Sequence, residues 1–192
     1  MSTNRSSRVS VSLVPARGPA ASIRVLGIDP GTVRLGYGVV ECGRFGAARG
    51  ETIRYVECGV LTASARASRP ERLAEIGRGL RELVEELRPD AVALEEAFYG
   101  KNVQSTLALG EARGVALFVA AERGLPIAGY APATVKQSVV GHGRATKDQV
   151  AFLVRALLSL RRVPAPDAAD ALAIAICHAR ASQGAPRKGR AP

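Results

Sequence analysis

Histidine, cysteine and tryptophan are scarce in this sequence. The 192 residues include two histidines, three cysteines and no tryptophan. Because His142 and His178 are the two histidines of the sequence, a histidine-based zinc site or a Ser-His-Asp triad is a poor explanation of its function. Cys42, Cys58 and Cys177 are odd in number and widely spaced, which predicts reduced, mostly buried thiols and no disulfide framework.

Long hydrophobic runs are also absent. No apolar stretch approaches the roughly 20 residues that a membrane-spanning helix requires. The N-terminal stretch contains Arg5, Arg8 and Arg17, but its short apolar segment is broken by Pro15, so it makes a poor signal peptide. We therefore expect a soluble, cytoplasmic protein.

Positive charge is plentiful. Lysine and arginine total 27 against 17 acidic residues, for a formal net charge of +10, and this excess favours a polyanionic partner such as nucleic acid. Residues 1–22 and 181–192 are basic and lack hydrophobic periodicity, so we expect disordered extensions at both ends. The intervening residues 23–180 are long enough for one well-filled domain.

The hydrophobic pattern predicts an α/β domain with a five-stranded mixed sheet covered by helices on both faces. The first three strands are joined by tight glycine-containing connections and should form an antiparallel meander. The expected strands are Ile23 to Asp29, Leu35 to Cys42, Thr52 to Leu61, Ala91 to Glu95 and Pro126 to Tyr130. The expected helices are Pro70 to Leu87, Val103 to Arg123, Thr134 to Val140, one capped by Thr146, and one beginning near Asp167.

Four acidic residues stand out against this background. Asp167 and Asp170 are three residues apart at the start of an otherwise apolar helix, so they share one face, although Asp167 could also simply cap the helix. Asp29 ends the first strand before Pro30-Gly31, where a turn aspartate is the alternative. Glu95 ends a strand expected at the buried centre of the sheet, and alternation alone does not separate it from Glu96.

Four carboxylates gathered from three segments would repel one another unless cations neutralised them. Oxygen-only ligands favour Mg²⁺ or Mn²⁺, and two such ions about 4 Å apart can clamp a scissile phosphate. The reaction this indicates is hydrolysis of a phosphodiester.

Several motifs, in order and spacing, resemble the bacterial RuvC family of Holliday-junction resolvases over about Ile23 to His178. These are Gly27-Ile28-Asp29-Pro30-Gly31 with Gly36-Tyr37-Gly38, Leu94-Glu95-Glu96-Ala97-Phe98, Lys101-Asn102, Gly110-Glu111-Ala112-Arg113-Gly114, Val135-Lys136-Gln137-Ser138-Val139-Val140-Gly141, and Asp167-Ala168-Ala169-Asp170-Ala171-Leu172-Ala173.

The resemblance implies an RNase H-like fold of the retroviral integrase superfamily and a homodimer that nicks two strands of like polarity symmetrically across a four-way junction. It places Asp29, Glu95, Asp167 and Asp170 on the family's catalytic, metal-binding acids, with two Mg²⁺ or Mn²⁺ ions per site, and selects Glu95 over Glu96. Some members carry histidine where Asp167 stands. The RuvA-RuvB branch-migration complex is a partner implied by the resemblance alone.

Further residues are candidates for DNA contact. Phe98 falls where the family presents an aromatic to bases near the crossover, although without the resemblance a core position is the simpler interpretation. For Tyr99, both a core position and a base contact remain open. Lys136 and Lys147 match family lysines near the DNA backbone. For Lys101, Arg144 and the pair Arg161-Arg162, solvated surface is the alternative to phosphate contact.

Other functions use parts of the same pattern. A non-catalytic junction-binding module would have no need for four acids beside phosphates, and an actin-like ATPase or sugar kinase requires a second domain. A generic RNase H-like nuclease is the nearest rival and differs in its substrate. The small-residue helix Val103 to Arg123 is the candidate dimer interface, although the same residues could pack on the sheet.

Overall fold

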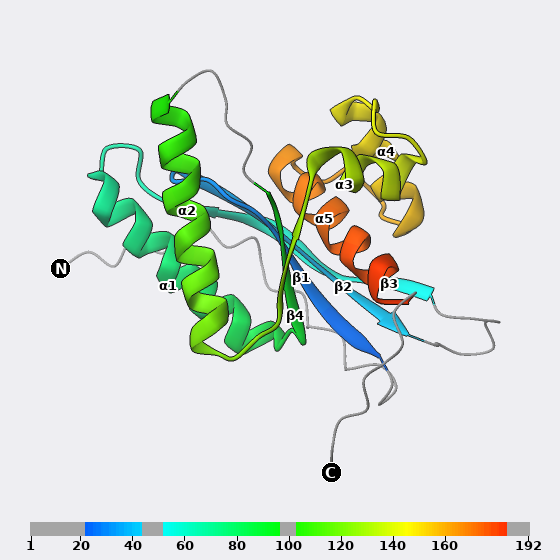
Figure 1. Ribbon diagram of the computed structural model, residues 1–192, viewed down its shortest axis with the longest axis horizontal. Helices are drawn as coiled ribbons and strands as arrows, with labels where there is room; N and C mark the ends of the chain where they lie inside the picture. Colours follow the sequence, from blue (N-terminus) through cyan, green and yellow to red (C-terminus); the bar gives the residue numbers. More distant parts are fainter. Residues whose placement is uncertain (1–21, 44–51, 97–102, 184–192) are drawn as a thin grey trace, which may run out of the picture.

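The computed structural model describes residues 22–43, 52–96 and 103–183. Within these residues the chain forms one five-stranded sheet and five helices (Figure 1). The strands are β1 (Ile23–Asp29), β2 (Arg34–Gly43), β3 (Thr52–Thr62), β4 (Ala91–Glu95) and β5 (Ile127–Tyr130). The helices are α1 (Arg69–Leu87), α2 (Val103–Glu122), α3 (Pro132–Val140), α4 (Lys147–Leu157) and α5 (Pro166–Gln183).

The sheet is mixed, with the strand order β3-β2-β1-β4-β5. Strands β1, β2 and β3 pair antiparallel, which confirms the predicted meander. Strand β4 runs parallel to β1 and to β5 because helices α1 and α2 serve as the crossover connections. The carboxyl ends of β1 and β4 therefore lie at the same edge of the sheet.

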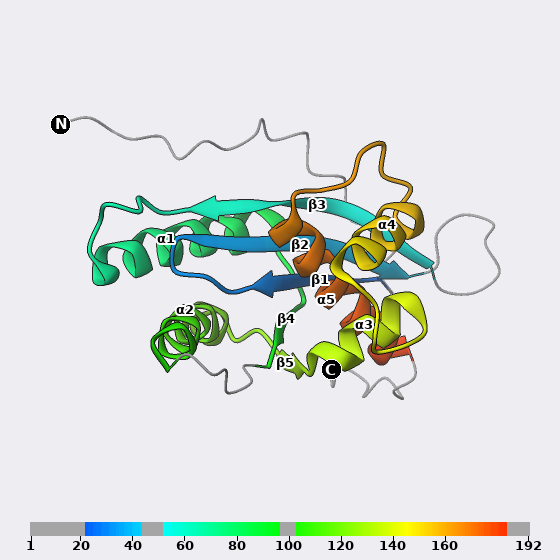
Figure 2. The same ribbon diagram turned by 90° about the horizontal axis from the view of Figure 1, so that it is seen from above.

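Helices cover both faces, as the hydrophobic pattern predicts (Figures 1 and 2). Leu26, Ile28 and Leu94 project into a core shared with α1 and α2. Val25 and Ala93 alternate with them and belong to the opposite core, built with α3, α4 and α5. Strands β1 and β4 thus contribute to both cores, and their remaining side chains can be assigned to a face from this alternation.

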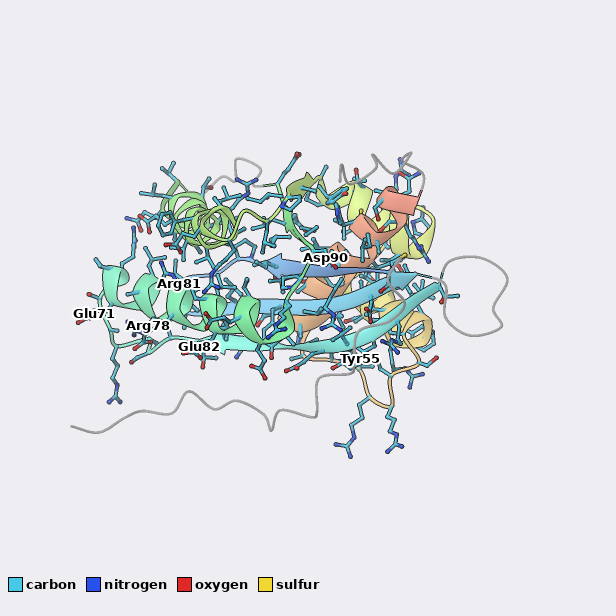
Figure 3. All side chains as sticks on the ribbon, turned by 90° about the horizontal axis from the view of Figure 1, so that it is seen from below. Tyr55, Glu71, Arg78, Arg81, Glu82 and Asp90 are labelled. Carbon is cyan, nitrogen blue, oxygen red and sulfur yellow. The ribbon has the colours of Figure 1, made fainter. Side chains whose placement is uncertain are left out.

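Helix α1 shows how local sequence signals and packing agree. Ser68 and Glu71 form a capping box at its start, and its buried residues recur at helical spacing. Four of its charged side chains, Glu71, Arg78, Arg81 and Glu82, are labelled in Figure 3. One of them, Arg81, pairs with Glu122 of α2 at 2.9 Å, so α1 and α2 are joined by polar as well as apolar contacts.

Most element boundaries agree with the prediction, and β1 and β4 match it at both ends. Helix α3 begins at Pro132, two residues earlier than expected, because proline is well suited to the first helical turn. Helix α5 continues through Gln183, three residues beyond the expected domain boundary.

Cys42 and Cys177 are buried, Cys58 is half-buried, and all three are free thiols. None of the helices in the described ranges is long and apolar enough to cross a bilayer.

Candidate active site

Two of the predicted acids lie side by side at the carboxyl edge of the sheet. Ile28 of β1 pairs with Leu94 of β4 in parallel register, so the next residue on each strand is an acid, Asp29 and Glu95. Leu94 faces the α1–α2 core, and alternation therefore turns Glu95 toward α5. Glu96 is exposed beyond the strand end, so the fold separates these two neighbouring glutamates.

Glycines in the sheet allow α5 to approach these strand ends closely. A Cβ atom built at Gly36 of β2 would lie 2.0 Å from the backbone oxygen of Asp167, and one at Gly27 of β1 would lie 2.1 Å from that of Ala171. At Gly38 the nearest atom would be the backbone nitrogen of Leu172, at 2.6 Å. Because no side chain occupies these positions, α5 rests directly on β1 and β2 and brings Asp167 and Asp170 to the edge where Asp29 and Glu95 lie.

Asp167 lies inside the first turn of α5 and is not its cap. The helix begins at Pro166, and the N–H of Ala169 donates to the oxygen of Ala165 at 2.8 Å. The Asp167 carboxylate instead accepts a hydrogen bond from Nε of Arg34, at 2.7 Å. The helix-cap interpretation of Asp167 is therefore wrong for this fold.

Asp170 is paired with a cation as well. Nζ of Lys147, the first residue of α4, donates to its Oδ2 atom at 2.7 Å. Thr146 fixes the start of α4, because its hydroxyl accepts from the N–H of Gln149 and the Gln149 side chain accepts from the N–H of Thr146. The predicted capping box thus holds Lys147 beside Asp170. We call Asp29, Glu95, Asp167 and Asp170 the acidic cluster.

The members of the acidic cluster influence one another electrostatically. Burial, the largest cause, and the charges of Asp170, Glu95 and Asp167 together raise the pKa of Asp29 from 3.8 to about 7, against the opposing effect of Lys147. Burial and Asp170 also raise the pKa of Glu95, while Lys147 and Lys136 lower it. The hydrogen bond to Asp170 raises the pKa of Lys147. Such mutual shifts among acids from separate segments are typical of functional sites.

No three His, Cys, Asp or Glu side chains within the described ranges are arranged as a ready-made metal site. The chemistry of the donor set nevertheless fits a hard divalent cation. The cluster offers only carboxylate oxygens, and burial together with the charges of the other three acids raises the pKa of Asp29 to about 7. Arg34 and Lys147 supply the positive charge beside Asp167 and Asp170 in this arrangement, each bonded to one carboxylate oxygen, and a cation would share these two acids with them.

The candidate DNA-contacting residues are only partly described. Phe98, Tyr99 and Lys101 lie outside the described residues. Lys136 of α3 is near enough to Glu95 to affect its pKa, and Arg144 is exposed in the connection before α4. Arg161 and Arg162 are exposed between α4 and α5.

Sequence reasoning missed Arg34, which reaches the acidic cluster from the start of β2. Its only sequence signal is its position two residues before Gly36, on the same face of the strand. That signal is too weak to single out one arginine among many.

Comparison with known proteins shows the family to which the chain belongs. The family model for "Crossover junction endodeoxyribonuclease RuvC" matches residues 25–178. The crossover junction endodeoxyribonuclease RuvC of Chloroflexus aggregans is 51% identical over 158 residues, which make up 82% of this chain and 93% of that relative.

Solved structures of Thermus thermophilus RuvC share the fold. One has a TM-score of 0.74 at 39% identity and covers 84% of this chain and 96% of its own. Another is of the same protein in complex with a Holliday junction substrate. It has a TM-score of 0.75 at 39% identity, and the match covers 84% of this chain and 95% of the solved one. The expected RNase H-like fold is thereby confirmed, and the chain belongs to the RuvC family of crossover junction endodeoxyribonucleases.

Proposed function

We propose that this protein resolves Holliday junctions in homologous recombination and DNA repair. It hydrolyses one phosphodiester in each of two strands of like polarity and leaves nicked duplexes that can be ligated. The observation that carries the proposal is the acidic cluster, whose four carboxylates come from β1, β4 and α5. Burial and the charges of the other three acids raise the pKa of its member Asp29 to about 7. Membership of the RuvC family and the net charge of +10 support DNA as the substrate.

We assign the acidic cluster to catalysis through divalent cations, Mg²⁺ or Mn²⁺, two per active site. Asp29, Glu95, Asp167 and Asp170 would hold them, and their chemistry would be to activate water and to stabilise the leaving oxygen of an in-line displacement. The chain itself contributes rigid placement. Two carboxylates are fixed at strand ends, and two near the start of a buried helix that packs against glycines of the sheet.

The basic residues around the cluster would receive the DNA backbone. Lys147 is 78% exposed although its amine is bonded to Asp170, so it can also face a phosphate. Lys136 and Arg144 extend the positive surface on α3 and before α4. Tyr99 and Lys101 are proposed as further contacts from the same stretch of sequence. Phe98 is assigned to the junction by its match to the family alone. The same is true of the RuvA-RuvB complex as a partner.

Substrate preference tests this assignment. Purified protein is incubated with a synthetic four-way junction, a linear duplex of matched sequence and an RNA-DNA hybrid, each with Mg²⁺, Mn²⁺ or chelator. We expect paired, metal-dependent nicks on the junction alone. Binding without cleavage under either metal would indicate a non-catalytic junction-binding module, and cleavage of the hybrid would indicate an RNase H-like ribonuclease.

We further propose that the protein acts as a homodimer through α2. The buried residues of this helix are Ala112, Ala116, Val119 and Ala120. At 3.6 residues per turn, the opposite face contains Val103, Leu107, Gly110, Gly114 and Phe118. Val103 is 79%, Leu107 57% and Phe118 56% exposed, and a Cβ atom built at either glycine would meet nothing within 4 Å.

A second copy of the chain suits this face because an apolar stripe flanked by glycines lets another helix approach closely. Two-fold pairing would also present two identical active sites to a nearly two-fold junction, so one binding event would position both cuts.

Leu107→Glu tests the dimer. Two glutamates would be brought together in a two-fold interface, so we expect the dimer dissociation constant to rise by at least about tenfold to a hundredfold. Sedimentation velocity over a range of concentrations measures it. Phe152→Glu is the matched control, since Phe152 is equally exposed at 57% but lies on α4. A dimer unaffected by Leu107→Glu would place the interface elsewhere.

A further inference from the structure

Arg34 is an exposed side chain that is held at the edge of the acidic cluster. Its Nε atom donates to Oδ2 of Asp167 at 2.7 Å, a contact that joins residues 133 positions apart. The Arg34 side chain is 55% exposed and that of Asp167 32%, so the pair lies at the surface of the protein. A long side chain in such a position is ordinarily free to sample many rotamers, and this ion pair restricts it.

The position of Arg34 follows from the fold. Arg34, Gly36 and Gly38 alternate along β2 and share the face that α5 covers. The two glycines make room for α5, and Arg34 lies beside the N-terminal end of that helix. Arg34 thus meets Asp167 where α5 begins, as Lys147 meets Asp170 from α4.

The contact with Asp167 uses only part of the guanidinium group. Arginine has five N–H donors in a planar fork, and the bond through Nε leaves the two terminal nitrogens available. Within the described ranges, the structure shows no hydrogen bond or ion pair from these terminal nitrogens. A planar pair of exposed donors matches two oxygens of one phosphate.

A cation is needed at this place for an electrostatic reason. DNA that reaches the acidic cluster brings phosphates toward four carboxylates, and like charges repel. A guanidinium at the rim attracts the phosphate while its other edge stays bonded to Asp167. An arginine can make both contacts at once, because its donors point in different directions.

We propose that Arg34 binds a phosphate of the cleaved DNA strand beside the acidic cluster, and that Asp167 positions it for that contact. The proposal rests on the proposed junction-cleaving function and adds Arg34 to the residues that recognise the substrate. Asp167 then serves both as a member of the acidic cluster and as the anchor of a DNA-binding arginine.

The salt dependence of junction binding tests the contact. Binding of a four-way junction is measured in EDTA, so that no strand is cut, between about 50 and 200 mM salt. We expect Arg34→Ala to weaken binding several-fold and to reduce the slope of log K against log salt by about 0.9 for each Arg34 that contacts a phosphate. Arg34→Lys retains the charge and should restore most of the slope. Arg123→Ala is the control, because Arg123 also pairs with a carboxylate, that of Glu85, at 2.9 Å but belongs to the α1–α2 layer.

A double-mutant cycle tests the role of Asp167. If Asp167 positions Arg34, the loss of affinity caused by Arg34→Ala should be at least about twofold smaller when Asp167 is already asparagine. Equal losses in both backgrounds would overturn the positioning role. A salt slope unchanged by Arg34→Ala, or one that Arg34→Lys fails to restore, would overturn the phosphate contact.

These outcomes are separate from a failure of the proposed function. If Arg34 has no role in DNA binding, the wild-type protein still nicks the junction with metal. If the function itself is wrong, the wild-type protein binds the junction no better than linear duplex and nicks neither.

Discussion

Asp29→Asn will reduce junction cleavage by about 10²–10³-fold or more and will make the folded protein more stable above neutral pH. The loss follows because Asp29 lies at the centre of the acidic cluster, and removing one strong electrostatic partner of a reacting group costs at least that much. The gain in stability follows because burial, and then the charges of three neighbouring acids, raise the pKa of this half-buried carboxylate to about 7. Asparagine has a similar shape and carries no charge.

The pH dependence of this gain has a definite sign. Below about pH 4 Asp29 is protonated in both the folded and the unfolded wild-type protein, so the variant has no electrostatic advantage. Between pH 4 and about 7 the unfolded chain ionises first, and the free energy of unfolding of the wild type falls as the pH rises. A pKa difference of this size corresponds to about 4 kcal/mol, and solvent screening reduces the expected gain above pH 7 to about 1–3 kcal/mol.

Denaturant unfolding at pH 4 and pH 8 measures the effect, with Asp148→Asn as the control. Asp148 is an exposed aspartate in the first turn of α4, close to Lys147 but outside the acidic cluster. The Asp148→Asn variant should show neither the gain in stability nor the loss of cleavage. An Asp29→Asn protein that is no more stable than wild type at pH 8 would mean that burial and the neighbouring acids do not destabilise the charged form of Asp29 as described.

Gly36→Ala should damage both stability and cleavage. The added Cβ atom would lie 2.0 Å from the oxygen and 2.4 Å from the carbonyl carbon of Asp167, and these are backbone atoms that cannot rotate away. Helix α5 must shift, so we expect a loss of about 3 kcal/mol in the free energy of unfolding. Because the shift also displaces Asp167 and Asp170, cleavage should fall by about 10²-fold, the scale associated with a 1 Å misplacement.

Gly77→Ala is the matched control. Gly77 is buried in α1, and its added Cβ atom would lie 3.3 Å from Cγ1 of Val115, a side-chain atom that can move. Alanine also suits a helix better than glycine, so this change should be close to neutral. Thermal unfolding and single-turnover cleavage of the two variants measure the difference. A Gly36→Ala protein with wild-type cleavage would show that the close seat of α5 is not required.

The parts of the fold set by local pattern could be predicted from sequence. The apolar runs of β1 and β4, the stripe of α1 and the capping box of α4 each contain their signal within a few residues. The choice between Glu95 and Glu96 is different, since it depends on which face of β4 meets α5. Within the sequence, only the motif resemblance selects Glu95. Helix α2 is apolar on nearly all sides, so periodicity alone left open whether its small residues face the sheet or a partner.

Long-range pairs of charged residues could not be predicted. Arg34 and Asp167 are brought together only because α5 seats on β2, and nothing local to either residue signals the other. Glu41 is another case. It is 1% exposed in the middle of the sheet, where Arg54 pairs with it at 2.7 Å. An alternating pattern treats such a glutamate as a surface residue, because burial of its charge is acceptable only with partners that tertiary structure supplies.

The most direct test of the acidic cluster as a metal site is the stabilisation of the DNA-free protein by Mg²⁺. The increase in melting temperature is measured for wild type and for Asp29→Asn at pH 6 and pH 8. Because a cation must displace the proton from Asp29, wild type should be stabilised more at pH 8 than at pH 6, and Asp29→Asn should respond weakly at both. Equal stabilisation of the two proteins at pH 8 would contradict the assignment of the acidic cluster to metal binding.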